Sequence, residues 1–172
     1  MVPLKKKEQD LKMPVTKPVK QVKIYTDGAC LGNPGPGGYG AVLLYGTLRK
    51  ELFGGFCLTT NNRMELMGAI AALQSLKTIC EVTLLTDSQY VVNGINKGWA
   101  RRWRQRGWMR NKTEKAVNPD LWELLLNLCE RHQVTFVWVR GHAGDPENEH
   151  CDELSKQAAM AKDLPVDKGY LP

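Results

Sequence analysis

Two aspartates stand in the same local context at distant places in the chain. Asp27 ends the segment Val22–Thr26 and Asp87 ends the segment Glu81–Thr86, and a threonine precedes each aspartate. Both segments are rich in β-branched residues, which predicts strands. If the strands are parallel neighbours, both carboxylates lie at the carboxyl edge of the sheet, where open α/β sheets bind ligands. Adjacent carboxylates repel unless a cation or proton lies between them, so the pair favours a metal site.

Two of the candidate acids also have ordinary structural interpretations. A lone aspartate such as Asp27, taken by itself, is usually a turn former or a helix cap. Glu65 lies in the first turn of a helix predicted to begin between Thr59 and Asn62. The spacing from Asn62 to Glu65 is that of a capping box, so a cap and a catalytic residue are equal alternatives on local evidence.

Two further candidates lie near the end of the chain. His142 stands in a loop between two glycines, and Asp152 lies on a helix predicted from about Glu147, beside its buried face. A loop histidine and a helix aspartate are ordinarily solvated groups without a special role. Their coincidence with the other acids is what favours a site.

Alternating or continuous apolar segments and helical stripes predict the elements that position these residues. The run from Gly32 to Gly40 contains five glycines and two prolines, which predicts turns. A short link at Gly46 predicts an antiparallel hairpin, and a helix between strands predicts a parallel crossover. Asn118 is expected to cap a helix whose stripe is Leu121, Leu124, Leu125 and Leu128. The remaining strands are expected over Tyr39–Tyr45, Leu48–Cys57 and Val134–Val139, and the remaining helices over Thr59–Leu73 and Ser88–Asn96.

Composition limits the class of protein. A chain of 172 residues with 42% hydrophobic content suits one domain, at residues 21–172, behind a flexible basic arm at residues 1–20. No apolar run is long enough for a membrane span, and the start lacks the apolar block of a signal peptide. Five widely spaced cysteines favour a reducing compartment over a disulfide framework or zinc site, so we expect a cytoplasmic location.

The segment from Lys97 to Lys115 is the most basic part of the chain. It holds eight lysines or arginines and one acid, Glu114, with tryptophans interleaved. A surface helix with packed tryptophans and solvated arginines would explain it. Phosphate binding is favoured in addition, because so many like charges cost stability unless an anion offsets them.

Five blocks in this order are similar to those of type 1 ribonuclease H, and most closely to bacterial ribonuclease HI. They are TDGACLGNPGPGGYGA, TTNNRMELMGAI, TDSQYV, NPDLW and GHAGDPENEHCDEL, and the resemblance runs from about Gln21 to Met160. It implies an α/β ribonuclease H-like fold, a five-stranded mixed sheet flanked by helices. It also implies divalent-metal-dependent hydrolysis of the RNA strand of RNA–DNA hybrids, leaving 5′-phosphate and 3′-hydroxyl ends.

The resemblance also implies roles for individual residues. The family's four metal-binding acids correspond to Asp27, Glu65, Asp87 and Asp152, and its loop histidine corresponds to His142. The residues expected to contact the RNA strand are Cys30, Asn33, Asn61 and Gln89. Those expected to contact the DNA strand are Thr60, Asn118, Trp99, Trp103, Arg101, Arg102 and Arg104.

Magnesium suits this set because it prefers oxygen ligands and keeps several waters. We expect two Mg²⁺ ions with substrate, with Mn²⁺ as an alternative, and Asp27 as the bridging ligand. Recognition of the 2′-hydroxyl rather than of bases predicts little sequence preference. The expected partner is the RNA–DNA hybrid duplex. We expect the protein to be a monomer and not to bind a membrane.

The chain departs from the family pattern at three places. Leu58 replaces an arginine of the DNA-phosphate pocket, Gly98 is an apparent insertion, and Asp145 replaces a loop histidine. Three other functions are alternatives. A stable basic domain with no enzymatic role would leave the two Thr-Asp strand ends unexplained. A DNA-cutting integrase or resolvase is disfavoured by the GNPG and TTNN blocks, and a non-catalytic hybrid-binding protein by the presence of all four acids.

Overall fold

The structure is a computed structural model, and it describes residues 17–172. Within this range five strands form one mixed sheet in the order β3-β2-β1-β4-β5. Strand β1 pairs antiparallel with β2 and parallel with β4. The strands are β1 (Lys20–Cys30), β2 (Gly35–Tyr45), β3 (Leu48–Thr59), β4 (Cys80–Thr86) and β5 (Gln133–Trp138), and the helices are α1 (Asn61–Gln74), α2 (Gln89–Asn96), α3 (Trp99–Gln105), α4 (Pro119–Arg131) and α5 (Pro146–Ala159).

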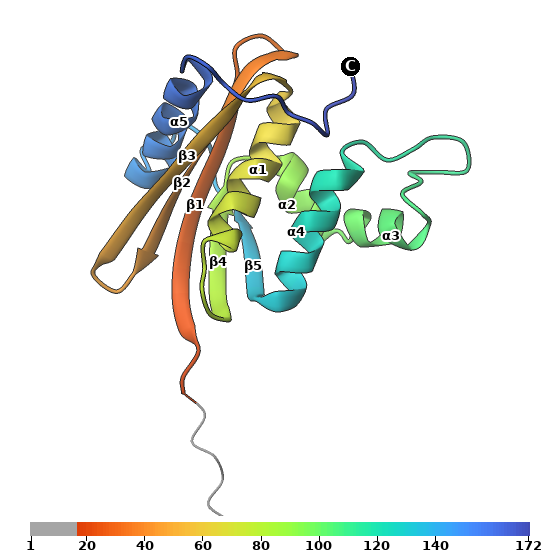
Figure 1. Cartoon of the computed structure of the whole chain (residues 1–172). Coiled ribbons are helices and arrows are strands. Elements are labelled where there is room, and N and C mark those ends of the chain that lie inside the picture. The colour runs from red at the N-terminus through yellow and green to blue at the C-terminus, as the bar shows by residue number, and fades with distance from the viewer. Residues whose placement is uncertain (1–16) are drawn as a thin grey trace, which may run out of the picture.

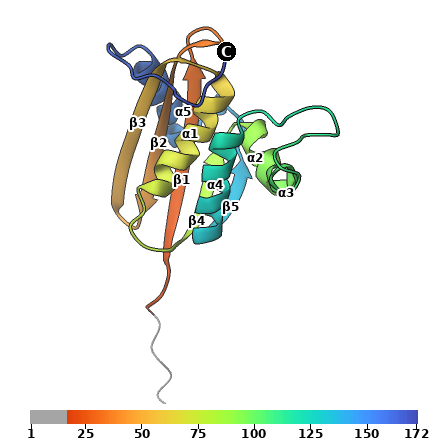
Figure 2. The ribbon, with the colours of Figure 1, turned by 45° about the vertical axis from the view of Figure 1, so that its right-hand side comes forward.

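Helices cover both faces of the sheet (Figure 1). Alternate residues of β1 point to opposite faces, so Ile24 joins the main core under α1 and α4, while Tyr25 packs with Cys151 and Leu154 of α5. Helix α3 and the loop after it project from the side of the molecule, as the rotated view shows (Figure 2). The predicted α/β class, hairpin and parallel crossover are confirmed.

Two predictions about the first strands were wrong. Strand β1 continues to Cys30, so Asp27 lies within it rather than at its end. Most of the glycine-rich run is strand β2, not turns. Its glycines are needed for close packing, because a methyl group on Gly38 would lie 2.3 Å from the carbonyl oxygen of Ser155 in α5.

Several helix details also differ from the predictions. Thr60 is the N-cap of α1 and accepts a hydrogen bond from the backbone N–H of Arg63, so Glu65 lies too far along to complete a capping box. Asn118 precedes α4 but makes no capping bond with its side chain. On α4, Leu124 is 43% exposed, and Trp122 is buried in its place.

The ends of the chain differ from the predicted division in one detail. Strand β1 begins at Lys20, so it includes the last residue assigned to the basic arm. The other arm residues up to number 16 lie outside the described range. None of the helices formed by the described residues is both long and apolar enough to span a membrane.

Candidate metal centre

Three carboxylates from three elements meet at one edge of the sheet. Asp27 of β1, Glu65 of α1 and Asp87, immediately after β4, each offer an oxygen within 4.8 Å of the others. Asp27 and Glu65 are buried, with 4% and 6% exposure, and Asp87 is half-buried. The predicted pairing of Asp27 with Asp87 is therefore confirmed, and Glu65 joins them.

The strand register explains why the two aspartates meet. The parallel ladder between β1 and β4 ends at Tyr25 opposite Leu85, so the two Thr-Asp pairs that follow are neighbours. Glu65 comes close because residue 28 is glycine. A methyl group there would lie 2.4 Å from the backbone nitrogen of Glu65, so any larger residue would push α1 away from the strand.

The three carboxylates disfavour one another's ionisation. Burial, then the charge of Asp87, raises the pKa of Asp27 to about 7, although the Gly28 N–H donates to Asp27 Oδ1 at 2.8 Å and opposes this. Burial and the charge of Asp27 raise the pKa of Glu65 well above its usual range. Burial and the charge of Asp152 raise the pKa of Asp87. Such a cluster is unfavourable without a compensating positive charge.

The residues present fit a hard divalent cation. Glu65 Oε2 is buried and lacks a hydrogen-bond partner, which leaves it available as a ligand. The clustered donors are all carboxylate oxygens, the type that Mg²⁺ and Mn²⁺ bind in preference to sulfur or imidazole.

Asp152 and His142 lie at the margin of this cluster. Asp152 of α5 pairs with Lys156 Nζ at 2.8 Å and is not among the three acids whose oxygens meet. Its charge nevertheless raises the pKa values of both Asp27 and Asp87, so it faces the same space. His142 is exposed in its loop, with a φ of 54°, and its charge lowers the pKa of Asp87.

The loop that carries His142 is packed onto Asp87. The indole N–H of Trp138 donates to the backbone carbonyl of Asp87 at 3.2 Å. A methyl group on Gly141 would lie 2.7 Å from Asp87 Oδ2. Asp145, one of the three residues that depart from the family pattern, is the N-cap of α5 and accepts from the backbone N–H groups of Glu147 and Asn148.

The residues expected at the DNA strand fall in two places. Thr60 and Asn118 both contact Arg63: its backbone N–H donates to Thr60 Oγ1, and its Nη1 donates to Asn118 Oδ1 at 3.3 Å. In the second place Trp99 and Trp103 of α3 line a hollow of about 500 Å³. Arg101 and Arg102 are exposed on the same helix, while Arg104 pairs with Glu130 of α4 and Leu58 is exposed on β3.

The residues expected at the RNA strand lie around the start of α1 and α2. Asn33 Oδ1 accepts the backbone N–H of Asn61 at 3.1 Å, so these two are brought together. The Cys30 thiol donates to the carbonyls of Gly35 and Thr59. Gln89 is exposed at the first position of α2, two residues beyond Asp87.

Two other features were missed from the sequence. Arg63 and Asp167 form a buried ion pair, with Nε 2.7 Å from Oδ2. The two residues are far apart in the sequence, and no local pattern shows that a charged residue will be buried, so the pair could not be predicted.

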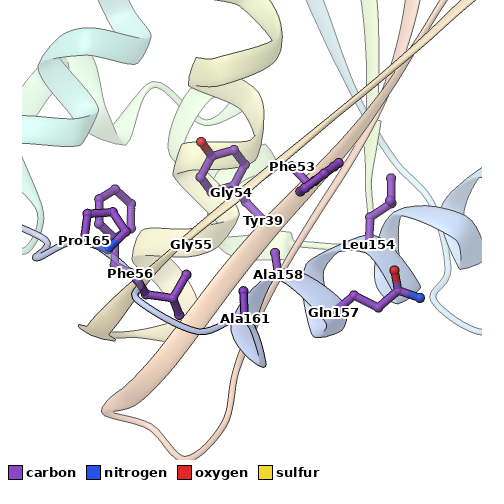
Figure 3. A pocket seen from close by; sticks show the side chains of 11 residues that line it. Tyr39, Phe53, Gly54, Gly55, Phe56, Leu154, Gln157, Ala158, Ala161 and Pro165 are labelled. Atoms are coloured by element: carbon purple, nitrogen blue, oxygen red, sulfur yellow. The ribbon is translucent and has the colours of Figure 1, made fainter.

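An apolar hollow of about 440 Å³ lies between α5, β3 and the C-terminal segment. It is lined by Phe53 and Phe56 among others and includes none of the acids of the cluster (Figure 3).

Comparisons with known proteins agree with this architecture. The family model for RNase H matches residues 19–160. A ribonuclease H from Syntrophus aciditrophicus is 69% identical over 89% of this chain and 88% of its own length. One from Desulforamulus reducens is 64% identical over 87% of this chain and 94% of its own.

Solved structures give the same relationship. The crystal structure of LC9-RNase H1, described as a type 1 RNase H with the type 2 active-site motif, has a TM-score of 0.75 and 35% identity. The match covers 84% of this chain and 74% of that one. LC11-RNase H1, crystallised in complex with an RNA/DNA hybrid, has a TM-score of 0.62 and 26% identity, covering 80% of this chain and 96% of that one.

Proposed function

Because the chain belongs to the ribonuclease H family and resembles its bacterial type 1 members, it is a hydrolase that cleaves the RNA strand of RNA–DNA hybrids, and we propose that the acidic cluster is its catalytic centre. The observation that carries the proposal is the meeting of three carboxylate oxygens within 4.8 Å, at the sheet edge where the family's acids are expected. Cleavage leaves 5′-phosphate and 3′-hydroxyl ends with little sequence preference.

Two Mg²⁺ ions are the proposed cofactors with substrate bound, and Mn²⁺ is the alternative. Asp27 would bridge them, Glu65 and Asp87 would hold one, and Asp152 would hold the other. When bound, such a pair supplies an activated water and neutralises charge on the phosphate. Lys156, which pairs with Asp152 at 2.8 Å, would keep that carboxylate oriented before the metal arrives.

His142 is proposed to move a proton or to help the product leave. The support is its position on an exposed loop that lies close to Asp87, since a methyl group added at the neighbouring Gly141 would be 2.7 Å from Asp87 Oδ2. Exchanging His142 for alanine should lower kcat and change its pH profile. An unchanged rate and profile would exclude both roles.

Selectivity for the hybrid needs groups that sense the 2′-hydroxyl, since only RNA carries one. Asn33, Asn61 and Gln89 offer amides and backbone groups that can both donate and accept. Cys30 would line the same surface. The opposite strand would be held by Thr60 and Asn118, and by Trp99, Trp103, Arg101, Arg102 and Arg104 on the basic projection around α3.

We also propose that the enzyme acts as a monomer in the cytoplasm. The five cysteines are free thiols, which suits a reducing compartment. Sedimentation at micromolar concentration, with and without hybrid, would test the first statement. A dimer in both conditions would contradict it.

The decisive experiment is cleavage of an end-labelled RNA–DNA hybrid beside matched RNA–RNA and DNA–DNA duplexes, with Mg²⁺ or EDTA. Native chain and Asp27→Asn are compared, and Glu81→Gln, an exposed acid at the other end of β4, is the control. We expect cutting of only the hybrid's RNA strand, lost with EDTA and with Asp27→Asn. Binding of the hybrid without cleavage would indicate a non-catalytic protein. Cleavage of duplex DNA instead would contradict the assignment of the RNA–DNA hybrid as substrate.

A further inference from the structure

A cluster of charges surrounds the buried side chain of Arg63 at the start of α1, and the proposed chemistry does not use it. Arg63 is only 2% exposed. It donates through Nε and Nη2 to both oxygens of Asp167, at 2.7 and 3.0 Å. It also donates through Nη1 and Nη2 to both oxygens of Asp120, at 2.9 and 2.7 Å. Such paired, bidentate contacts fix a guanidinium in one orientation.

The C-terminal segment supplies half of this cluster. After α5 the chain crosses to the starts of α1 and α4, as both views of the ribbon show (Figures 1 and 2). The carbonyl of Pro165 accepts from the N–H of Cys57 at 2.9 Å, and Thr59 Oγ1 donates to Asp167 Oδ2 at 2.7 Å. Gly169 lies so close that a methyl group there would be 1.9 Å from Asp120 Oδ2. The segment is therefore fastened to β3 and to Arg63.

The same arginine touches both residues proposed to hold a DNA phosphate. Its Nη1 donates to Asn118 Oδ1 at 3.3 Å, and its backbone N–H donates to Thr60 Oγ1 at 3.3 Å. Asn118 has a φ of 57°, which asparagine tolerates, and its Nδ2 donates to the hydroxyl of Tyr90 at 3.2 Å. The side-chain oxygens of Thr60 and Asn118 are thus engaged as acceptors. The Thr60 hydroxyl hydrogen and the second Nδ2 hydrogen of Asn118 are left as donors for an anion.

We propose that Asp167 is a positioning residue for substrate: it fixes Arg63, and Arg63 orients Asn118 and Thr60 toward a phosphate of the DNA strand. This inference rests on the proposed function, because it needs those two residues to contact the hybrid. It gives the C-terminal segment a part in binding although it lies outside the matched family region, residues 19–160.

Charge and geometry predict opposite effects of changing Asp167. Two carboxylates face one guanidinium, so the cluster carries no excess positive charge to attract a phosphate. If charge alone mattered, neutralising Asp167 would strengthen hybrid binding. If orientation matters, the same change releases one side of Arg63. Binding then weakens, because the hydrogen-bond donors of Asn118 and Thr60 are no longer held toward the phosphate.

The test compares Asp167→Asn with Asp163→Asn, which makes the same charge change at an exposed position of the same segment. Cleavage kinetics are measured on a normal hybrid and on a series in which one DNA-strand phosphate at a time is a neutral methylphosphonate. For Asp167→Asn we expect KM to rise about five- to tenfold with kcat within about twofold, the size of one lost hydrogen bond at the positioned amide. Asp163→Asn should leave KM unchanged.

The modified hybrids separate positioning from a general loss of structure. In the native chain, the methylphosphonate at the bound phosphate should raise KM, whereas in Asp167→Asn it should add little, because the contact is already impaired. The inference would be overturned if the effects of Asp167→Asn and of the methylphosphonate on KM were fully additive, or if Asp167→Asn lowered KM. If Asp167→Asn does not fold, as judged by circular dichroism, Thr59→Val removes one hydrogen bond to the same carboxylate and is expected to give the same pattern at smaller size.

The experiment also distinguishes this inference from the function beneath it. A native chain that does not cut RNA in the hybrid would overturn the proposed function. A native chain that cuts but is insensitive to every DNA-strand methylphosphonate would overturn the phosphate contact and the inference with it. A sensitive native chain with an unaffected Asp167→Asn would overturn the inference alone.

Discussion

Asp27→Asn should make the metal-free protein more stable while it abolishes cleavage. Asp27, Glu65 and Asp87 are held with their oxygens within 4.8 Å, and burial together with mutual repulsion raises all three pKa values. Without a cation, the folded chain must either carry this repulsion or bind protons. An asparagine of the same shape removes one charge and can still accept the hydrogen bond from Gly28 N–H.

The size of the effect follows from the pKa of Asp27. It rises from 3.8 to about 7 in the folded chain. A tenfold change in proton affinity is worth about 1.4 kcal/mol, so full ionisation of this one group at pH 8 costs about 4 kcal/mol. The three acids titrate together and share that cost. We therefore expect about 2 kcal/mol of stabilisation, which for a chain of this length is a rise in Tm of about 4–8 °C.

The contribution of Asp27 to stability should change with pH in the opposite direction to that of most carboxylates, whose pKa values are lowered by folding. A group whose pKa is raised by folding contributes stability that is fully present below its unfolded pKa, here 3.8, and lost as the pH rises through about 7. The advantage of Asp27→Asn should thus be large at pH 8, smaller at pH 6 and absent near pH 4. Mg²⁺ should raise the Tm of the native chain at pH 8 and raise that of the variant less.

Thermal unfolding followed by circular dichroism in EDTA, at these three pH values, measures the difference. Glu81→Gln is the control, because it removes an exposed charge elsewhere on the same sheet and should change Tm little. A variant that is less stable than the native chain at pH 8, or a difference that does not vary with pH, would refute the electrostatic account of the cluster.

Three further predictions concern other parts of the molecule. Gly141→Ala should lower kcat at least tenfold with little change in Tm, because its methyl group would lie 2.7 Å from Asp87 Oδ2; steady-state kinetics beside Ala143→Ser tests this. Burial, then the charge of Arg131, lowers the pKa of His132, whose Nδ1 accepts the Cys80 N–H. An NMR titration of this ring should therefore give a midpoint below the ordinary value of 6.5, and a midpoint at 6.5 or above would contradict it. Arg101→Glu should raise KM and flatten its salt dependence more than it lowers kcat, whereas equal loss at saturating hybrid would argue against phosphate binding.

Much of the site could be predicted because its determinants repeat in the sequence. Two Thr-Asp pairs after apolar strands indicated neighbouring carboxylates, and the parallel register between β1 and β4 confirms it. The helix predicted over Thr59–Leu73 matches α1 closely, and its apolar residues Leu66, Ala69, Ile70 and Leu73 are all buried. These signals are local, and the hydrophobic core enforces them.

The glycine-rich run was misread because its cause is distant. Glycines next to prolines usually make turns, but Gly38 and Gly40 are strand residues against α5, more than a hundred positions later in the chain. A methyl group on Gly40 would lie 2.7 Å from Leu154 Cβ. Local composition therefore showed that this run needs glycines. It did not show why, because the need for small residues comes from the packing of α5 against the strand.

With the roles proposed above, Arg63 and Glu65 would join substrate binding to catalysis within the start of one helix. Both lie in the first turns of α1, two positions apart, and therefore face different sides of the helix. Glu65 points to the acidic cluster, while Arg63 is held by Asp120 and Asp167 beside Thr60 and Asn118. The repulsion at Glu65 would tend to push the start of α1 off the sheet, and the ion pairs of Arg63 oppose that movement. A rigid α1 start would thus keep a fixed distance between the phosphate contact on one strand and the cleavage centre on the other, which is what selective cutting of one strand requires.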